Sequence, residues 1–93
     1  MAWKIRFGKH ATIAMAARRI KSELILPTLE KPDEKFFDIS TGHVVVVRQI
    51  NSSSLVVAYD IVGKTYEVVT VFETSKIEKI IKRKVEIGYW ARL

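Results

Sequence analysis

The 93-residue sequence predicts a single α+β domain in which an N-terminal strand and two short helices precede an antiparallel β-meander and a C-terminal helix. Three patterns support this order. Apolar residues alternate at the N-terminus, they recur at helical spacing in later segments, and short β-rich runs separated by turn residues lie between those segments. The length suits one domain, because two cores would leave each half too small to bury enough apolar surface.

The first third of the chain changes from a strand pattern to a helical pattern. Apolar and charged side chains alternate in residues 3–7, which predicts a strand with one buried face. Residues 11–19 are rich in alanine and predict a helix. A second short helix is expected to begin at Ser22, a good N-cap, and to stop before Pro32. Because Pro27 lies too deep for the first turn of such a helix, the helix must be kinked there or begin later.

The middle of the chain predicts a meander of adjacent antiparallel strands. The strands are expected at residues 35–39, 43–50, 54–60 and 64–72, with turns between them. Four consecutive valines precede Arg48 in the second strand. A strand that is apolar on both sides of the alternation is typical of the centre of a sheet that is covered on both faces.

The C-terminal segment has the clearest helix signals. Ser75 and Glu78 have the spacing of a capping box, an apolar stripe follows at helical spacing, and Gly88 supplies the stop. We expect Tyr89 and Trp90 to pack back onto the body of the domain. A basic stripe occupies the other side of this helix and consists of Lys76, Lys79, Lys82 and Arg83.

The composition excludes several protein classes. An apolar fraction of 48% is too high for a disordered chain, and the absence of cysteine excludes a disulfide scaffold, a thiol nucleophile and a cysteine-ligated metal site. No apolar run approaches the ~20 residues that span a bilayer, and the N-terminus lacks the apolar run of a signal peptide. We therefore expect a cytoplasmic protein with no membrane partner. A single Gln and a single Asn beside many Lys are typical of thermophile proteins.

Positive charge is concentrated at the two ends of the sequence. The net charge is +6, and residues 1–26 and 73–93 carry the excess of basic residues. This distribution makes a polyanion such as RNA the first partner to consider. The alternative is that the charge serves only solubility, since a net charge of this size is ordinary for a small domain.

The residue types available for chemistry suit RNA cleavage without a metal. The sequence has no Gly-rich phosphate loop, HExxH, GxSxG or EF-hand spacing, and no spacing suggests a set of metal ligands, so we expect neither metal nor cofactor. His, Arg, Lys and Tyr remain. They suffice for a base that deprotonates the 2′-OH, cations that stabilise the phosphorane and an acid that protonates the leaving 5′-oxygen.

His10 and Arg48 are the leading candidates for this chemistry. His10 is expected where the first strand meets the first helix, and the helix N-terminus there favours the neutral imidazole; its alternative role is to satisfy a backbone group at that turn. His43, at the start of the central strand, is a candidate to pair with His10. Arg48 continues a largely buried strand and therefore requires an anion. That anion is either a substrate phosphate or a carboxylate on a neighbouring strand, Asp60 or Glu67.

Other basic and aromatic residues are candidates for RNA contact. Arg18 and Arg19 end the first helix, where they either contact phosphate or complement the helix dipole. The basic stripe of the C-terminal helix either contacts phosphate or forms a solvated face. Tyr59 and Tyr66, on sheet strands, either stack on a base or pack within the domain.

Short motifs over nearly the whole chain resemble a small prokaryotic family of unknown function, whose members read roughly KHA-x-x-R-M-x-x-R-x-I, a second helix and an acidic Pro-Asp turn. The matching positions are His10-Ala11, Met15, Arg18, Ile20, Glu23, Ile25, Glu30-Lys31-Pro32-Asp33, Arg48, 55–59, 68–72 and Thr74-Ser75. That family resembles the BrnT and RelE toxin superfamily, small α+β domains of which many are ribonucleases held inactive by an antitoxin.

The resemblance has implications for fold, partners and site. It implies that residues 1–93 form one RelE/BrnT-like toxin-type domain, with RNA as the substrate class and an antitoxin as the protein partner. Position by position, it implies roles for His10, Arg18, Arg48, Tyr59 and Thr70.

Three positions depart from the family pattern. Ala14 stands where the motif has its first arginine, Arg19 stands where a glycine is expected, and Pro27 interrupts the second helix. Because the first helix has lost a basic residue, a degenerate or repurposed member of the family is an alternative to an active one.

The sequence as a whole predicts a toxin-like RNA-binding domain that acts as a metal-independent endoribonuclease. This hypothesis requires the catalytic residues His10, Arg48 and Tyr59 on one concave surface. The alternatives are a non-catalytic basic module that binds nucleic acid or a protein partner, and a structural subunit that forms a homodimer through a sheet edge.

Overall fold

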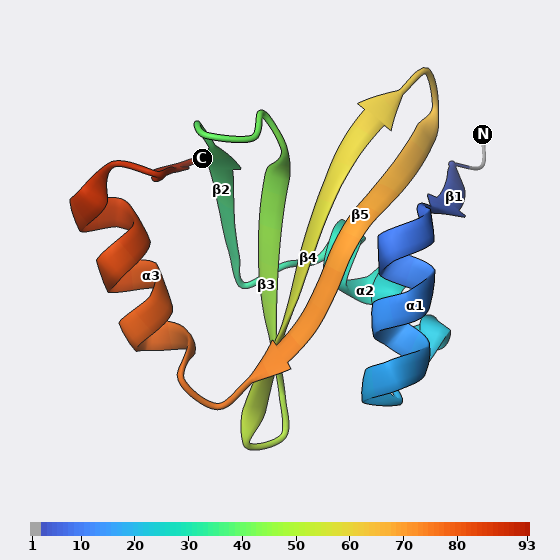
Figure 1. The fold of residues 1–93 in the computed structure, drawn as a ribbon, viewed down its shortest axis with the longest axis horizontal. Helices are drawn as coiled ribbons and strands as arrows, with labels where there is room; N and C mark the ends of the chain where they lie inside the picture. Colours follow the sequence, from blue (N-terminus) through green and yellow to red (C-terminus); the bar gives the residue numbers. More distant parts are fainter. Residues whose placement is uncertain (1–2) are drawn as a thin grey trace.

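The computed structural model describes residues 3–93, in which six strands form one sheet with helices against both of its faces (Figure 1). The predicted α+β class is therefore confirmed. The elements in chain order are β1 (Lys4–Phe7), α1 (Lys9–Arg18), a 3₁₀ turn (Ser22–Leu24), α2 (Ile25–Glu30), β2 (Glu34–Asp38), β3 (Val44–Ile50), β4 (Ser53–Val62), β5 (Thr65–Thr74), α3 (Ile77–Ile87) and β6 (Trp90–Arg92).

The four strands from β2 to β5 form the expected antiparallel meander. The sheet order is β1-β5-β4-β3-β2-β6, so β1 lies beside β5, to which it is parallel, and β6 pairs antiparallel with β2. Trp90 packs back onto the domain, as expected, and is 5% exposed. The strand that it begins was not predicted, because a run of three residues has no periodicity of its own.

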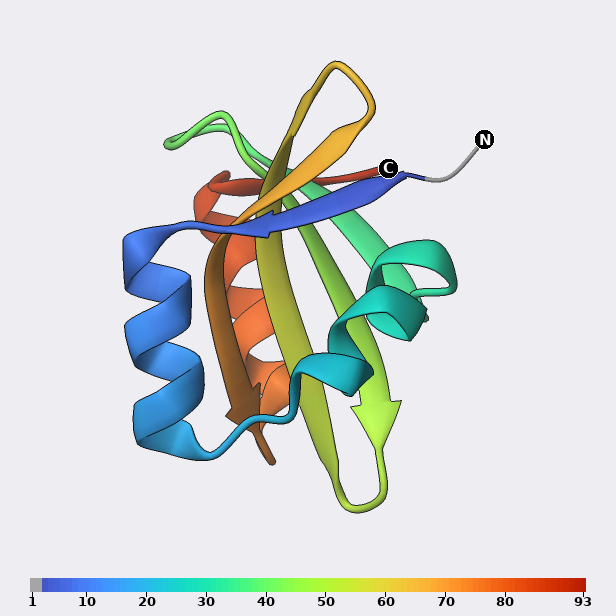
Figure 2. The ribbon, with the colours of Figure 1, turned by 90° about the vertical axis from the view of Figure 1, so that its right-hand side faces the viewer.

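The sheet separates two apolar cores. On one face, Met15 of α1 and Ile25 of α2 pack with Val46 of β3; on the other, Ile81 of α3 packs with Val45. Figure 2 looks onto the face that carries α1 and α2, with α3 behind the sheet. Consecutive valines of β3 thus serve opposite cores, which confirms the predicted central strand with two buried faces.

The first two helices begin at other residues than expected. Helix α1 begins at Lys9, so His10 lies inside its first turn and not ahead of the helix. Ser22 makes no side-chain cap; it begins the 3₁₀ turn, and α2 starts only at Ile25. Pro27 then falls in the first turn of α2, where its missing N–H removes no intrahelical bond. This confirms that a helix containing Pro27 begins later than Ser22.

The predicted capping box at the start of α3 is wrong. Lys76 is the N-cap residue, and no side chain caps this helix. The Oγ1 atom of Thr74 instead accepts a hydrogen bond of 3.0 Å from the Lys76 N–H, one position before the helix begins. The first-turn N–H groups of α3 are consequently left without a side-chain acceptor.

Helix α3 covers only part of its face of the sheet. Its core includes residues of β2, β3 and β4 together with Phe72 of β5, whereas near the β4–β5 hairpin β5 and β1 carry charged side chains on the same face. We call this uncovered area the open face and define it by Arg6, His43, Asp60 and Glu67. No helix within residues 3–93 is long and apolar enough to cross a membrane.

Candidate nucleic-acid interface

Three of the sequence-predicted residues lie together on the outer side of α1. His10, Arg18 and Thr70 line a hollow of about 400 Å³, which Ile13, Ala14 and Ala17 complete. Its walls are one face of α1 and the outer edge of β5. The hollow therefore combines an imidazole, a guanidinium and a hydroxyl group.

The Arg18 side chain is anchored at the rim of this hollow. Its Nη1 atom donates a hydrogen bond of 2.8 Å to the Val71 carbonyl of β5. Strand β1 pairs only with residues 65–68 of β5. The Val71 carbonyl lies past the end of that pairing, and Arg18 is its hydrogen-bond donor. Arg18 thus fastens α1 to the sheet edge, and its remaining N–H groups are the ones that a phosphate would engage.

Arg19 follows α1 as its C-cap residue, with φ 54° and ψ 40° in the left-handed region. Its backbone N–H donates to the Ala16 carbonyl at 3.3 Å, and its side chain is exposed. Glycine favours this conformation because it lacks Cβ. Arg19 therefore holds a backbone conformation that glycine would adopt without steric cost.

Arg48 lies away from the His10 hollow. Its Nη1 atom donates a hydrogen bond of 2.8 Å to the Lys31 carbonyl, which belongs to the C-cap residue of α2. The expectation that Asp60 or Glu67 pairs with Arg48 is wrong. Arg48 lies opposite Leu55, on the face that carries α1 and α2, whereas both acidic side chains belong to the open face on the other side.

Tyr59 is a core residue, which corrects its predicted catalytic role. Its side chain is 2% exposed and packs edge-on against Tyr66, with ring centroids 5.3 Å apart. Burial raises the pKa of the Tyr59 phenol above its usual 10.0, and Tyr66 adds to the increase. A group enclosed in this way cannot meet an RNA phosphate together with His10 and Arg48, so the predicted catalytic trio is not assembled on one surface.

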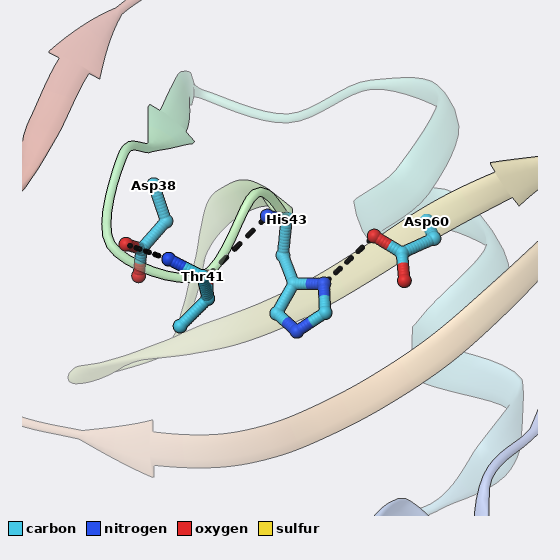
Figure 3. A network of polar contacts seen from close by, with 4 residues as sticks. All are labelled: Asp38, Thr41, His43 and Asp60. Carbon is cyan, nitrogen blue, oxygen red and sulfur yellow. Dashed lines mark hydrogen bonds and ion pairs between the residues drawn. The ribbon is translucent and has the colours of Figure 1, made fainter.

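His43 lies on the opposite side of the sheet from His10, so the expected histidine pair does not form. Its Nδ1 atom lies 2.7 Å from Oδ1 of Asp60, across the β3–β4 pair (Figure 3). With the proton on Nδ1 the imidazole donates to Asp60 and keeps Nε2 as its basic nitrogen. The backbone N–H of His43 donates to Thr41 Oγ1 at 3.3 Å, and the Thr41 N–H donates to Asp38 Oδ1 at 3.2 Å. These contacts fix the loop from which His43 enters β3.

The basic stripe of α3 divides among three surroundings. Lys76 and Lys79 line a polar pocket at the start of the helix, and Arg83 lines a groove against β5. Lys82 lies on the side of the helix that faces β2 and β6, in a hollow shared with Glu34, Glu78 and Glu86. Glu34 is paired with Arg92, which also lines this hollow, and Glu78 and Glu86 remain to offset the charge of Lys82. Lys82 is therefore the weakest of the four as a phosphate ligand.

The groove between α3 and β5 combines aromatic and cationic side chains. It measures about 500 Å³ and is lined by Phe72, Ile80, Arg83, Lys84, Ile87 and Tyr89. The Nζ atom of Lys84 lies 5.3 Å from the centroid of the Tyr89 ring and 6.0 Å from that of Trp90. This combination suits a single-stranded nucleic acid, because its bases stack on aromatic rings and its phosphates pair with cationic side chains.

Sequence reasoning missed Phe72, Lys84 and Tyr89 as parts of an interface. The available signal was Lys84, a cation interrupting the apolar side of the C-terminal helix. Among residues 3–93, no group of three or more His, Asp or Glu side chains is arranged to hold a metal ion. Comparisons with protein-family models, curated proteins and solved structures found no match for this chain.

Proposed function

We propose that this chain is a RelE/BrnT-like, toxin-type domain that binds single-stranded RNA. The observation that carries the proposal is the groove between α3 and β5, where Phe72 and Tyr89 accompany Arg83 and Lys84. Stacking on aromatic rings does not depend on base sequence, and the cations supply salt-dependent attraction to phosphates. The chain's net charge of +6 favours the same partner.

The order of elements supports the RelE-like part of the proposal. A strand, two helices, a four-stranded antiparallel meander and a helix follow one another, as the residue patterns predict, and this α+β order suits a small toxin-type domain. The added strand β6 is a departure from that order. An antitoxin would be the protein partner of such a domain, and the cytoplasm its location.

RNA cleavage without a metal is the second candidate function. It is favoured by the His43–Asp60 contact, which holds an imidazole on the open face, and by His10 in the hollow beside Arg18. Either imidazole would act as the base or acid of the transesterification. The separation of His10, Arg48 and Tyr59 argues against the catalytic trio predicted from the sequence, so binding is the primary proposal.

The first experiment measures binding of a labelled single-stranded RNA across a salt series. We expect affinity to fall steeply with salt, and Arg83→Gln and Lys84→Gln each to lower the salt slope by roughly 0.7. Lys35→Gln is the matched control, since it removes the same charge from an exposed position on β2, outside the groove. Equal changes of the salt slope in all three variants would refute the groove as the RNA-binding site. Absence of RNA binding by the wild type would refute RNA binding as the function.

The cleavage experiment uses the same RNA with EDTA present. His10→Ala and His43→Ala are compared with the wild type after their folds have been matched by circular dichroism. Loss of about a hundredfold or more in one variant would assign the general acid or base to that histidine. If the wild type binds the RNA but does not cleave it, the remaining hypothesis is a non-catalytic RNA-binding module.

A further inference from the structure

A polar pocket of about 350 Å³ lies at the start of α3, apart from the groove and from the hollow on α1. Ile77, Glu78 and Lys79 all line it, and these residues form the first turn of the helix. Their N–H groups have no intrahelical acceptor, and no side chain caps the helix. The pocket therefore borders a set of uncapped backbone donors at the positive end of an 11-residue helix.

The floor of the pocket is a row of polar side chains from three neighbouring strands. Gln49 of β3 lies opposite Ser54 of β4, which in turn lies opposite Thr74 of β5, and all three line the pocket. Thr74 already accepts the Lys76 N–H through Oγ1. The neighbouring Ser53 donates its hydroxyl to Glu73. These two hydroxyls thus have partners within the protein.

The Ser54 hydroxyl is different. The residue is only 5% exposed, and within the part of the chain that the structure describes its side chain makes no hydrogen bond. Val56, two positions further along β4, packs in the core on the α3 side, so the Ser54 side chain points to that same face, where the pocket lies. Among the described residues no fully buried side-chain oxygen lacks a partner, so the Ser54 hydroxyl retains some contact with solvent. Because no group of residues 3–93 engages it, the Ser54 hydroxyl is free to donate a hydrogen bond to an acceptor bound in the pocket.

The charge around the pocket favours an anion. Lys76 and Lys79 line it together with one acidic residue, Glu78. The volume far exceeds the ~30 Å³ share of a single water molecule, so a tetrahedral anion with its hydration fits.

We propose that this pocket binds an oxyanion, with a phosphate group as the ligand chemistry. The uncapped N–H groups of α3 and the Ser54 hydroxyl donate hydrogen bonds to its oxygens, while Lys76 and Lys79 balance its charge. The site goes beyond the proposed RNA groove, because it shares no lining residue with that groove and requires no base to stack.

The test is a titration of the ¹⁵N-labelled protein with inorganic phosphate, followed through backbone amide chemical shifts. We expect saturable shifts at Ile77, Glu78 and Lys79. Ser54→Ala and Lys79→Gln should each weaken binding by about tenfold, because each removes a contact with a charged acceptor. Ser22→Ala and Lys35→Gln are the matched controls, since both positions are exposed and lie outside the pocket.

Two further arms distinguish the source of the phosphate. A short RNA with a 5′-phosphate and the same RNA with a 5′-hydroxyl are titrated in place of inorganic phosphate. Shifts with both RNAs assign an internal backbone phosphate, and shifts with only the first assign a terminal phosphate. The proposal is overturned if the amide shifts of Ile77, Glu78 and Lys79 stay unchanged with all three ligands. It is also overturned if a folded Ser54→Ala variant binds phosphate as tightly as the wild type. The titration with inorganic phosphate does not depend on RNA binding. It can therefore refute the phosphate pocket without refuting the RNA groove, and the RNA assay can refute the groove without refuting the pocket.

Discussion

The imidazole of His43 and the carboxylate of Asp60 meet across two strands, with Nδ1 and Oδ1 2.7 Å apart, although 17 positions separate them in the chain. Val44 pairs with Tyr59 in the antiparallel β3–β4 register. His43 precedes Val44 and Asp60 follows Tyr59, so these two residues lie opposite each other. Asp60 thereby orients the ring, and Nε2 is left for contacts on the open face.

A double-mutant cycle tests this contact. We expect Asp60→Ala and His43→Ala each to lower the free energy of unfolding by about 1 kcal/mol, since each removes one partner of a half-exposed hydrogen bond. The double variant should lose less than the sum, by about 0.5 kcal/mol. Urea unfolding of the four proteins at neutral pH measures the coupling. Strictly additive losses would show that the two side chains do not interact.

Asp38 should make stability depend on pH in the acid range. Burial raises the pKa of its carboxyl group, but hydrogen bonds from Ser40, Thr41 and Trp90 outweigh burial and hold the pKa below 3.8. A lowered pKa stabilises the folded protein above pH 3.8, and the contribution is lost as the pH falls from there through the folded-state pKa.

The variant Asp38→Asn isolates that contribution. At neutral pH we expect it to lower the free energy of unfolding by about 1 kcal/mol, because a charged acceptor is replaced by a neutral one. The difference from the wild type should shrink below pH 3.8. Glu30→Gln, at an exposed position, should leave the pH profile unchanged. A difference that persists at acid pH would contradict this assignment.

Tyr59 should matter for stability and not for RNA. Because its ring is 2% exposed, Tyr59→Ala should lower the free energy of unfolding by about 3–5 kcal/mol. Tyr59→Phe keeps the ring and should bind RNA as the wild type does, with a change of less than about 1 kcal/mol in stability. A folded Tyr59→Phe protein that loses an RNA-dependent activity would restore the catalytic assignment.

Arg48 should support α2. Its guanidinium donates to the Lys31 carbonyl at the helix C-terminus, so Arg48→Ala should lower the free energy of unfolding by about 1 kcal/mol. RNA affinity should fall no more than in Lys35→Gln, which also removes one positive charge. Thermal unfolding and the RNA binding assay measure the two effects. A large loss of affinity with unchanged stability would instead indicate a phosphate ligand.

Arg19→Gly should stabilise the domain. The residue adopts φ 54°, a conformation that costs an L-residue about 1 kcal/mol relative to glycine. We expect a gain of about 0.5–1 kcal/mol in the free energy of unfolding. Arg19→Ala removes the same charge but keeps Cβ, so it should bring no such gain. Equal stabilities of the two variants would show that the charge, and not the backbone, decides the effect.

The sequence alone determined most of the strands and helices, although not β6 and not the residues at which α1 and α2 begin. Alternation marked β1, the valine run marked a strand buried on both faces, and the spacing of apolar residues marked α1 and α3. These signals are local and periodic, because backbone geometry repeats every two or 3.6 residues. Apart from β6, the strands and helices and the α+β class could therefore be predicted without any knowledge of long-range contacts.

The partners of individual polar side chains were decided only by the tertiary structure. Arg48 finds a helix C-terminus and not a carboxylate, His43 finds Asp60 and not His10, and the start of α3 remains uncapped. Each outcome depends on strand register and on which face of the sheet a residue occupies. A shift of one position reverses the face, and no local pattern specifies which element packs against it. Local sequence patterns specify the strands and helices, whereas the candidate sites depend on how those strands and helices pack together.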